Sequence, residues 1–299
     1  MIIKLYYRVA GLAFAVELYE GIELETRLSA YKPFVCNKTD DLLFRMPVIV
    51  DDSGSPSKDE CKWRLLVNDS FKDVISEIYV DTHGDYHYVS KLENKAGMWS
   101  SIDYNREFSD MKCRVHGDAG FQLFALNNAL MLMFALCSST KETLLFHASV
   151  VKFEGKGYLF LGKSGTGKST HSQLWLNHIK GCELLNDDYP AIRLINGKPC
   201  VFGTPWSGKT PCYKNEQVLV GGFIRLWQAP VNEIKRLSLF EAYGALLPTV
   251  TNMRWEKKCA DAVSVSIQKL IEDTPVFSLK NRPEKEAAVM SFHALTTGK

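Results

Sequence analysis

The sequence predicts a two-domain chain, with a small β-rich domain over residues 1–115 and an α/β domain of α+β character over residues 116–299. Two observations carry this prediction. The first 115 residues consist of short apolar runs separated by turn signals, which are typical of strands. From about residue 145, strand-like runs alternate with helical patterns around a glycine-rich stretch. At 299 residues and 46% hydrophobic content, the chain can bury two adjoining cores.

The composition narrows the class of protein. Lys and Arg (36) nearly balance Asp and Glu (34), which leaves a net charge of +2, so neither nucleic acid nor a membrane is expected as a partner. Apolar side chains stand at every second position from Ile3 to Val9, which is the period of a strand and not the pattern of a signal peptide. The eight cysteines form no Cys-x-x-Cys pair. We therefore expect a cytoplasmic protein with reduced thiols and no structural metal site.

The predicted N-terminal domain carries no chemical motif. Residues 42–50 and 75–80 are apolar runs that predict strands, and the second run leads into a hairpin turn at 83–85. Residues 51–60 are polar and contain Gly, Ser and Pro, so they predict an exposed loop. We expect an accessory domain that completes a cleft or binds a partner.

A nearly all-apolar helix is predicted over residues 120–137, with Asp118 as its N-cap. Its apolar part is about a turn short of a bilayer span and contains Gln122, Asn127 and Asn128. A buried core helix is therefore expected, and the domain boundary is placed near residue 115.

The central motif is Gly162-Lys-Ser-Gly-Thr-Gly-Lys-Ser169, which has the spacing of a phosphate-binding loop between a strand at 158–161 and a helix from Thr170. Glycines let backbone N–H groups curl around a polyphosphate, and the helix presents its positive end to the same anion. Lys168 is expected to reach the β- and γ-phosphates, and the Ser169 hydroxyl to ligate Mg²⁺. The residues expected to bind the nucleotide are Gly162, Lys163, Ser164, Gly165, Thr166, Gly167, Lys168, Ser169 and Thr170.

The loop is predicted to be entered from an antiparallel hairpin. Residues 145–151 and 158–161 are strand-like, and residues 154–157 between them have turn composition. Continuing the pairing places His147 opposite the start of the loop, near Lys163. His147 is thus a candidate beside the phosphates, the alternative being a buried histidine that donates to a backbone carbonyl.

Two adjacent carboxylates, Asp187 and Asp188, follow the next short strand at 182–185. Such a pair suits a magnesium–nucleotide site, in which one carboxylate holds the metal. The second has a separate use, because an alcohol is too weak an acid to attack phosphorus without a base. Two solvated turn aspartates are the alternative interpretation.

A second hairpin is predicted at Asn196-Gly197, the strongest short-range hairpin signal. Continuing its ladder sets Pro205 opposite Asp188 and returns residues 203–209 to the carboxylates. Lys209 is therefore a candidate contact to the transferred phosphate or to the acceptor, or else a solvated lysine in a structural turn.

The remaining chain is predicted to be supporting structure. Ser238 and Glu241 form a capping box at the start of a helix that stops at Pro248. An amphipathic helix is expected over 255–271, a strand over 276–279, and a last helix from Pro283.

The run from His147 to Asp188 resembles the catalytic domain of HPr kinase/phosphorylase and, more distantly, the nucleotide site of phosphoenolpyruvate carboxykinases. The shared features are a strand that begins with His, a hairpin, a Gly-x-Ser-Gly-x-Gly-Lys-Ser/Thr loop and a strand that ends in Asp-Asp. The resemblance implies a carboxykinase-like mixed sheet. It also implies that Asp187 is the base, assisted by His147, and that Asp188 is the metal carboxylate. The glycine-rich signature that follows the carboxylates in HPr kinases is not recognisable in this sequence, and residues 203–209 stand in that region.

These observations predict an ATP- and Mg²⁺-dependent kinase that transfers the γ-phosphoryl group to a hydroxyl, such as a serine, of a protein or a small metabolite. The alternative is a nucleotide-binding regulatory module without phosphotransfer, and carboxykinase chemistry is a third hypothesis. The sequence leaves open the acceptor, the preference for ATP or GTP, and whether the chain forms a homo-oligomer.

Overall fold

The computed structural model describes residues 2–19, 28–51, 62–71, 73–95, 97–208 and 210–298, and has a mixed α/β fold. The predicted loop at 51–60 lies outside the described residues except for Asp51, and Lys209 also lies outside them. The chain divides into two compact units, Met1–Cys137 and Ser138–Lys299.

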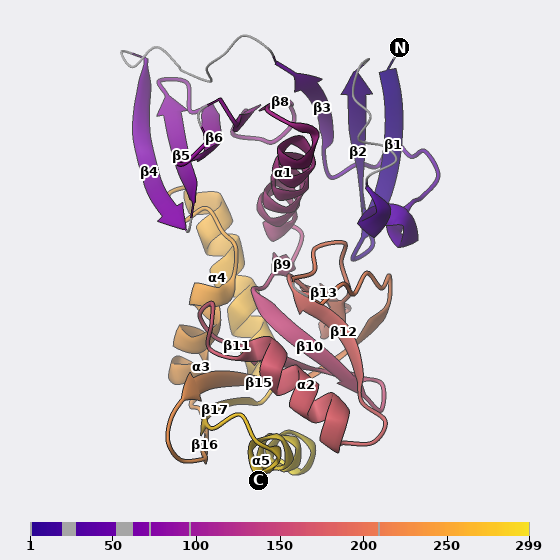
Figure 1. Ribbon diagram of the computed structural model, residues 1–299, viewed down its shortest axis with the longest axis vertical. Coiled ribbons are helices and arrows are strands. Elements are labelled where there is room, and N and C mark those ends of the chain that lie inside the picture. The colour runs from indigo at the N-terminus through magenta and orange to yellow at the C-terminus, as the bar shows by residue number, and fades with distance from the viewer. Residues whose placement is uncertain are drawn as a thin grey trace. The chain divides into compact units, whose positions relative to one another are not determined.

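The first unit is an eight-stranded sheet with one long helix, α1 (Figure 1). The strand order is β1-β2-β3-β8-β7-β6-β5-β4, with parallel pairing only at β2–β3 and β3–β8 within the described ladders. Its elements are β1 Ile2–Val9, β2 Leu12–Tyr19, a 3-10 helix Ser29–Phe34, β3 Arg45–Val50, β4 Trp63–Phe71, β5 Val74–Asp81, β6 Tyr86–Leu92, β7 Trp99–Tyr104, β8 Met111–His116 and α1 Ala119–Ser139.

Helix α1 lies in the hollow of this sheet, with β4–β6 on one side and β1–β3 on the other (Figure 1). Asp118 caps it as predicted, because its carboxylate accepts a hydrogen bond from the Phe121 amide at 2.8 Å. By length and composition alone α1 could cross a bilayer, as many core helices could, and 56% of its most apolar window is buried in the protein.

The observed division after Cys137 falls later than the boundary predicted near residue 115. The reason is the packing of α1. Its Phe134 ring lies edge-on to Phe14 of β2 at 6.1 Å, and its Asn127 accepts a hydrogen bond from Tyr31 at 2.9 Å. These contacts join α1 to β2 and to the 3-10 helix Ser29–Phe34, which precede it in sequence.

The second unit is a nine-stranded mixed sheet with helices on both faces (Figure 1). The main strand order is β12-β10-β11-β15-β14-β13-β9; β17 is parallel to β15, and β16 pairs with β17. Its elements are β9 Thr143–Leu145, β10 Ala148–Phe153, β11 Lys156–Leu161, α2 Lys168–His178, β12 Glu183–Asp188, β13 Ala191–Ile195, β14 Lys198–Phe202, β15 Gln217–Gln228, β16 Glu233–Arg236, α3 Leu239–Leu246, a 3-10 helix Leu247–Thr249, α4 Lys257–Glu272, β17 Val276–Asn281 and α5 Lys285–Thr297.

The alternation of side chains along β11 divides the core of this unit into two layers. Leu159 and Leu161 point to the layer that contains α3 and α4. Tyr158 and Phe160 point to the layer that contains Trp175 of α2 and the apolar face of α5. The predicted capping box is confirmed at the start of α3, where Ser238 and Glu241 bond reciprocally. The sheet is thus held between two helical layers, and the strand ends carry the loops.

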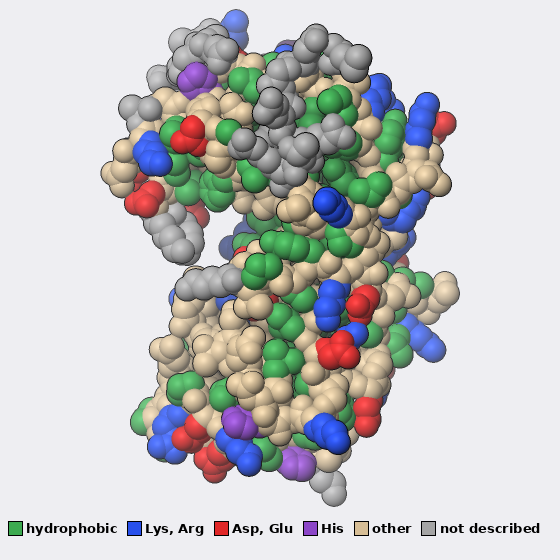
Figure 2. Space-filling view, turned by 45° about the vertical axis from the view of Figure 1, so that its right-hand side comes forward, with side chains coloured by type: hydrophobic (Ala, Val, Ile, Leu, Met, Phe, Trp, Pro, Cys, Tyr) green, Lys and Arg blue, Asp and Glu red, His purple; other side chains and the backbone are tan. Residues whose placement is uncertain are grey.

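The surface charge of the second unit is mixed. On the face drawn in Figure 2, Lys and Arg side chains lie among Asp and Glu side chains instead of forming one basic patch. This arrangement agrees with the near balance of charges in the sequence.

Candidate functional site

The stretch of residues 162–169, called here the glycine loop, connects β11 to α2, which is the strand–loop–helix context that its motif requires. Gly162 is needed at its start. Its φ is +154°, and a Cβ atom there would lie 2.3 Å from the Thr166 hydroxyl oxygen. The Thr166 hydroxyl donates to the Lys163 carbonyl at 2.8 Å, which braces the turn from within.

The hairpin that enters the loop has the predicted register within one residue. Ala148 pairs with Leu161, and Phe153 pairs with Lys156 across the turn. His147 therefore precedes the ladder at the level of Gly162. Its backbone amide donates to the Thr249 carbonyl at 2.7 Å, which fixes the start of β10.

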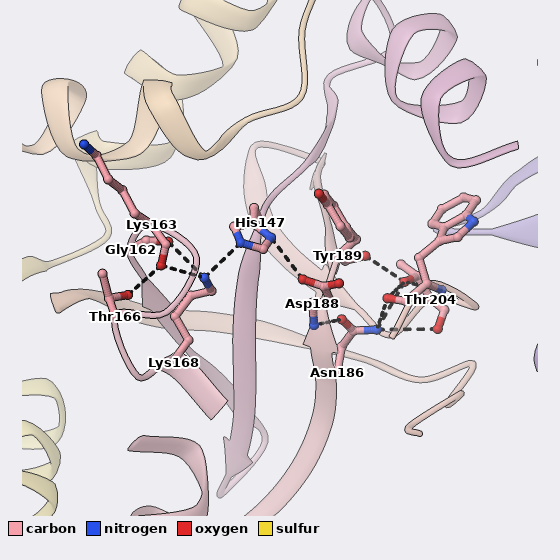
Figure 3. A network of polar contacts seen from close by, with 10 residues as sticks. His147, Gly162, Lys163, Thr166, Lys168, Asn186, Asp188, Tyr189 and Thr204 are labelled. Atoms are coloured by element: carbon pink, nitrogen blue, oxygen red, sulfur yellow. Dashed lines mark hydrogen bonds and ion pairs between the residues drawn. The ribbon is translucent and has the colours of Figure 1, made fainter. Parts of the chain in front are cut away.

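The Lys168 ammonium folds back over the loop and meets His147 (Figure 3). It donates to the Gly162 carbonyl at 2.9 Å, to the Lys163 carbonyl at 3.3 Å and to His147 Nε2 at 2.9 Å. Burial lowers the pKa of Lys168 below its ordinary value, and this effect exceeds the opposing effect of the nearby Asp188 and Asp187 carboxylates. A lysine in this position can exchange carbonyl partners for phosphate oxygens.

The contact with Lys168 assigns the tautomer of His147. Because an ammonium only donates, Nε2 must accept, and the ring proton lies on Nδ1. Nδ1 is 3.0 Å from Asp188 Oδ1, so the N–H side of the neutral ring lies against the carboxylate, although the N–H direction does not complete a hydrogen bond. The histidine side chain therefore lies between a cation and an anion (Figure 3), in place of the bond to a backbone carbonyl considered as the alternative.

Asp188 stands at the end of β12, with its side chain about one-third exposed (32%). Its backbone amide donates to the Asn186 side-chain oxygen at 3.1 Å, and Asn186 in turn donates to the Thr204 hydroxyl at 3.1 Å. Thr204 donates to the Tyr189 carbonyl at 2.7 Å. This network fixes the backbone on both sides of the carboxylate (Figure 3).

Asp187 differs from its neighbour because it is only 3% exposed. It pairs with Ser149 of β10, and its buried Oδ2 atom has no hydrogen-bond partner among the described residues. The Gly208 amide donates to its backbone carbonyl at 2.6 Å. A Cβ atom on Gly208 would lie 2.7 Å from that oxygen, so only glycine fits over Asp187.

The second hairpin returns the chain to the carboxylates as predicted. Ala191 pairs with Phe202 across the Asn196-Gly197 turn. Beyond Phe202 the ladder does not continue in the same register. Ser207, and not the predicted Pro205, therefore forms the bridge to Asp188. The role of Lys209 stays a prediction because this residue is outside the described part of the chain.

The donor set fits a magnesium ion that is shared with a nucleotide. In the described ranges no three or more His, Cys, Asp or Glu side chains gather as a metal site. Such a site is not required, because Mg²⁺ with a nucleotide keeps several waters and takes only one or two protein carboxylates. The exposed Ser169 hydroxyl in the first turn of α2 and the Asp188 carboxylate are ligands of this kind.

A cavity of about 320 Å³, called here the helix-side cavity, opens where the glycine loop meets α2. Two buried polar atoms in its lining residues have no partner among the described residues, His171 Nδ1 and Asn281 Oδ1. Burial lowers the pKa of His171 to about 4, and its Nε2 shares the Ser291 hydroxyl with the Trp175 N–H at 2.9 Å each. Residues lining this cavity include Gly167, Thr170, His171, Gln228, Asn281 and Arg282.

A second cavity of about 190 Å³, called here the histidine-side cavity, lies on the other side of the loop. Residues lining it include His147, Gly162, Lys163, Arg225, Trp227 and Thr249.

Sequence reasoning missed the strand residues of both cavities. Gln228 and Asn281 end β15 and β17, and Arg225 lies three residues earlier on β15; both strands belong to one run of parallel strands with β11. Ligands bind at the carboxyl ends of parallel strands, but the sequence did not predict that these strands pair in parallel.

The comparisons with known proteins add a distant likeness. No family model and no curated protein sequence matches this chain. One similar solved structure is the Hpr(Ser) kinase/phosphatase from Coxiella burnetii, at 13% identity and a TM-score of 0.32, over 52% of this chain and 88% of that chain. This is a distant structural relationship, and the interpretation of the site therefore depends on its own residues.

Proposed function

We propose that the second unit is an ATP- and Mg²⁺-dependent kinase that transfers the γ-phosphoryl group to a hydroxyl. The observation that supports it most is the line of contacts from Lys168 through His147 to Asp188 at the start of the glycine loop. A phosphate-binding cation, a proton-carrying ring and a carboxylate are thus joined where a transferred phosphate would lie.

In this proposal the glycine loop and Lys168 hold the triphosphate. Loop N–H groups and the N-terminus of α2 face the β-phosphate, and Lys168 contacts the γ-phosphate. Ser169 and Asp188 would hold Mg²⁺, whose charge neutralises the phosphate oxygens. The nucleoside would extend into the helix-side cavity, whose volume of about 320 Å³ is in the range for small-molecule pockets.

Asp187 is proposed as the base. Its Oδ2 has no partner among the described residues and can accept the proton of an acceptor hydroxyl. The His147 ring contacts Asp188 and not Asp187. We therefore give it the role of a positioning residue that orients the metal carboxylate and Lys168, whereas the sequence had suggested that it assists the base.

The test compares Asp187→Asn with Asp188→Asn in the full chain. Labelled ATP, Mg²⁺ and host lysate should yield a labelled acceptor with the wild type. Asp187→Asn should abolish the label and leave ATP affinity unchanged, since it removes only the base. Asp188→Asn should raise the Mg²⁺ concentration required for activity.

Labelling that survives Asp187→Asn would remove Asp187 from its role. ATP binding by calorimetry, without transfer to any lysate fraction, would support the nucleotide-binding regulatory module instead.

A further inference from the structure

The histidine-side cavity is lined by positively charged side chains that the proposed phosphoryl transfer does not by itself require. Besides His147, it is lined by two cationic side chains, Lys163 and Arg225, and no Asp or Glu of the described part of the chain lines it. The Lys163 side chain is exposed and extends away from Lys168 (Figure 3). Among the described residues it has no ion-pair partner. An aqueous pocket with two cations and no carboxylate favours an anionic ligand.

Arg225 is held in a fixed direction. It lies on β15 opposite Leu161, the residue before the glycine loop. Its guanidinium stacks over the Trp227 ring at 4.6 Å from the centroid, and one N–H donates to the Gly244 carbonyl at 3.3 Å. Stacking leaves the edge of the guanidinium available, and this planar edge matches the two oxygens of a carboxylate or phosphate.

The size of the cavity limits the ligand. Its volume of about 190 Å³ is below the range of about 300–1,000 Å³ that is usual for drug-sized molecules. The lining contains His147 and Gly162, beside the place where the γ-phosphate is expected, and it also contains Arg225 and Trp227. A compact molecule can therefore place a hydroxyl at the loop and an anionic group at Arg225.

We propose that this cavity binds a small acceptor that carries a carboxylate or phosphate close to the hydroxyl that is phosphorylated. The proposal rests on the kinase function proposed above. The hydroxyl oxygen forms the new bond to the γ-phosphorus, and the bond from that phosphorus to the β,γ-bridging oxygen breaks. The hydroxyl proton passes to the base proposed above, Asp187, which lies outside the lining of the cavity, and the products are ADP and a phosphate ester.

The experiment measures ADP formation by the full chain with three probes. D-Glycerate and glycerol 3-phosphate carry an anion beside their hydroxyls, and glycerol has similar hydroxyls without one. We expect at least about tenfold greater kcat/KM with an anionic probe than with glycerol. Arg225→Gln should raise the KM for that probe about tenfold or more, with ATP affinity unchanged, and Arg225→Lys should be intermediate.

The matched control is Arg236→Gln, an exposed arginine on β16 outside the cavity, which should change neither constant. Equal use of glycerol, or an unchanged KM in Arg225→Gln, would overturn the proposal. So would ATP binding with transfer to lysate protein but to none of the three probes. ATP binding with transfer to nothing would contradict the proposed kinase function and not this proposal alone. A chain that does not bind ATP would instead contradict the proposed kinase function.

Discussion

The two sides of the glycine loop differ in the burial of their histidines and in the charged groups around them. On the helix side, His171 is 1% exposed and uncharged, because burial lowers its pKa to about 4. On the histidine side, His147 is about one-third exposed (31%) and lies between Lys168 and Asp188. Both histidines contact or flank the same loop, but only one of them is surrounded by charge.

This difference suggests that the helix side binds the nucleotide and that the histidine side takes part in phosphoryl transfer. Unpaired but uncharged buried atoms, such as those of His171 and Asn281, favour a ligand that offers matching hydrogen bonds. Opposite charges held on either side of one ring, such as the buried Lys168 and the partly exposed Asp188 beside His147, respond to a change of charge nearby. We therefore expect helix-side variants to change nucleotide affinity or stability, and histidine-side variants to change phosphoryl transfer to the acceptor.

The largest effect is expected for Lys168→Met, because Lys168 is the group at which the two sides meet. Phosphoryl transfer should fall by about 10²–10³-fold or more, the usual cost of removing a group that stabilises transition-state charge. The free energy of unfolding should change little, because burial already disfavours the charged lysine. Steady-state kinetics and urea unfolding measure the two quantities, and the exposed Lys156→Met on β11 is the control.

The next effect is a dependence of stability on pH through His171. Its folded pKa of about 4 lies below the ordinary value of 6.5, so as the pH falls the unfolded chain binds the proton first. The stabilisation is complete above pH 6.5 and is lost between pH 6.5 and 4, by about 3 kcal/mol.

Urea unfolding of the wild type and of His171→Gln between pH 7 and 4 measures this difference. The variant should lose less stability than the wild type over that range. Parallel curves for the two proteins would contradict the pKa shift.

A smaller effect is expected for His147→Ala on the other side. If His147 orients the metal carboxylate and Lys168, its loss should reduce transfer about 10- to 100-fold and raise the Mg²⁺ requirement. His147→Gln, which keeps a donor and an acceptor, should recover part of the activity. A loss of ATP affinity with unchanged turnover would show that His147 acts in nucleotide binding, and the proposed difference between the two sides of the glycine loop would then be wrong.

The smallest effect is expected for Asn281→Leu. The buried side-chain oxygen Oδ1 of Asn281 has no partner among the described residues. If the nucleotide donates a hydrogen bond to it, nucleotide affinity should fall about three- to tenfold in the variant without a change in kcat. Calorimetry with ATP and GTP measures the change and shows which base is affected. The exposed neighbour Lys280→Met is the control.

Local sequence signals predicted the parts of the site that one hairpin can set. The turn at 154–155 fixed the pairing of β10 with β11 and so placed His147 beside the loop. The Asn196-Gly197 turn brought the following segment back to Asp188 with an error of two residues. Both succeed because a two-residue turn determines the register of its hairpin.

Contacts between distant segments could not be predicted in this way. The packing of α1 on β2 moved the division between the units from near residue 115 to Cys137. The pairing of His147 with Asp188, the burial of His171 against α5 and the position of Arg225 beside the loop likewise depend on which strands and helices pack together.

The sequence by itself determined the glycine loop, its two flanking hairpins and the adjacent carboxylates, because their geometry follows from turn residues and short spacing. Only the tertiary structure decided the surroundings of the loop. Parallel pairing of β11, β15 and β17 requires crossovers through distant chain segments, and no local pattern encodes which strands become neighbours. That pairing is what places Gln228 and Asn281 on one side of the loop and Arg225 on the other.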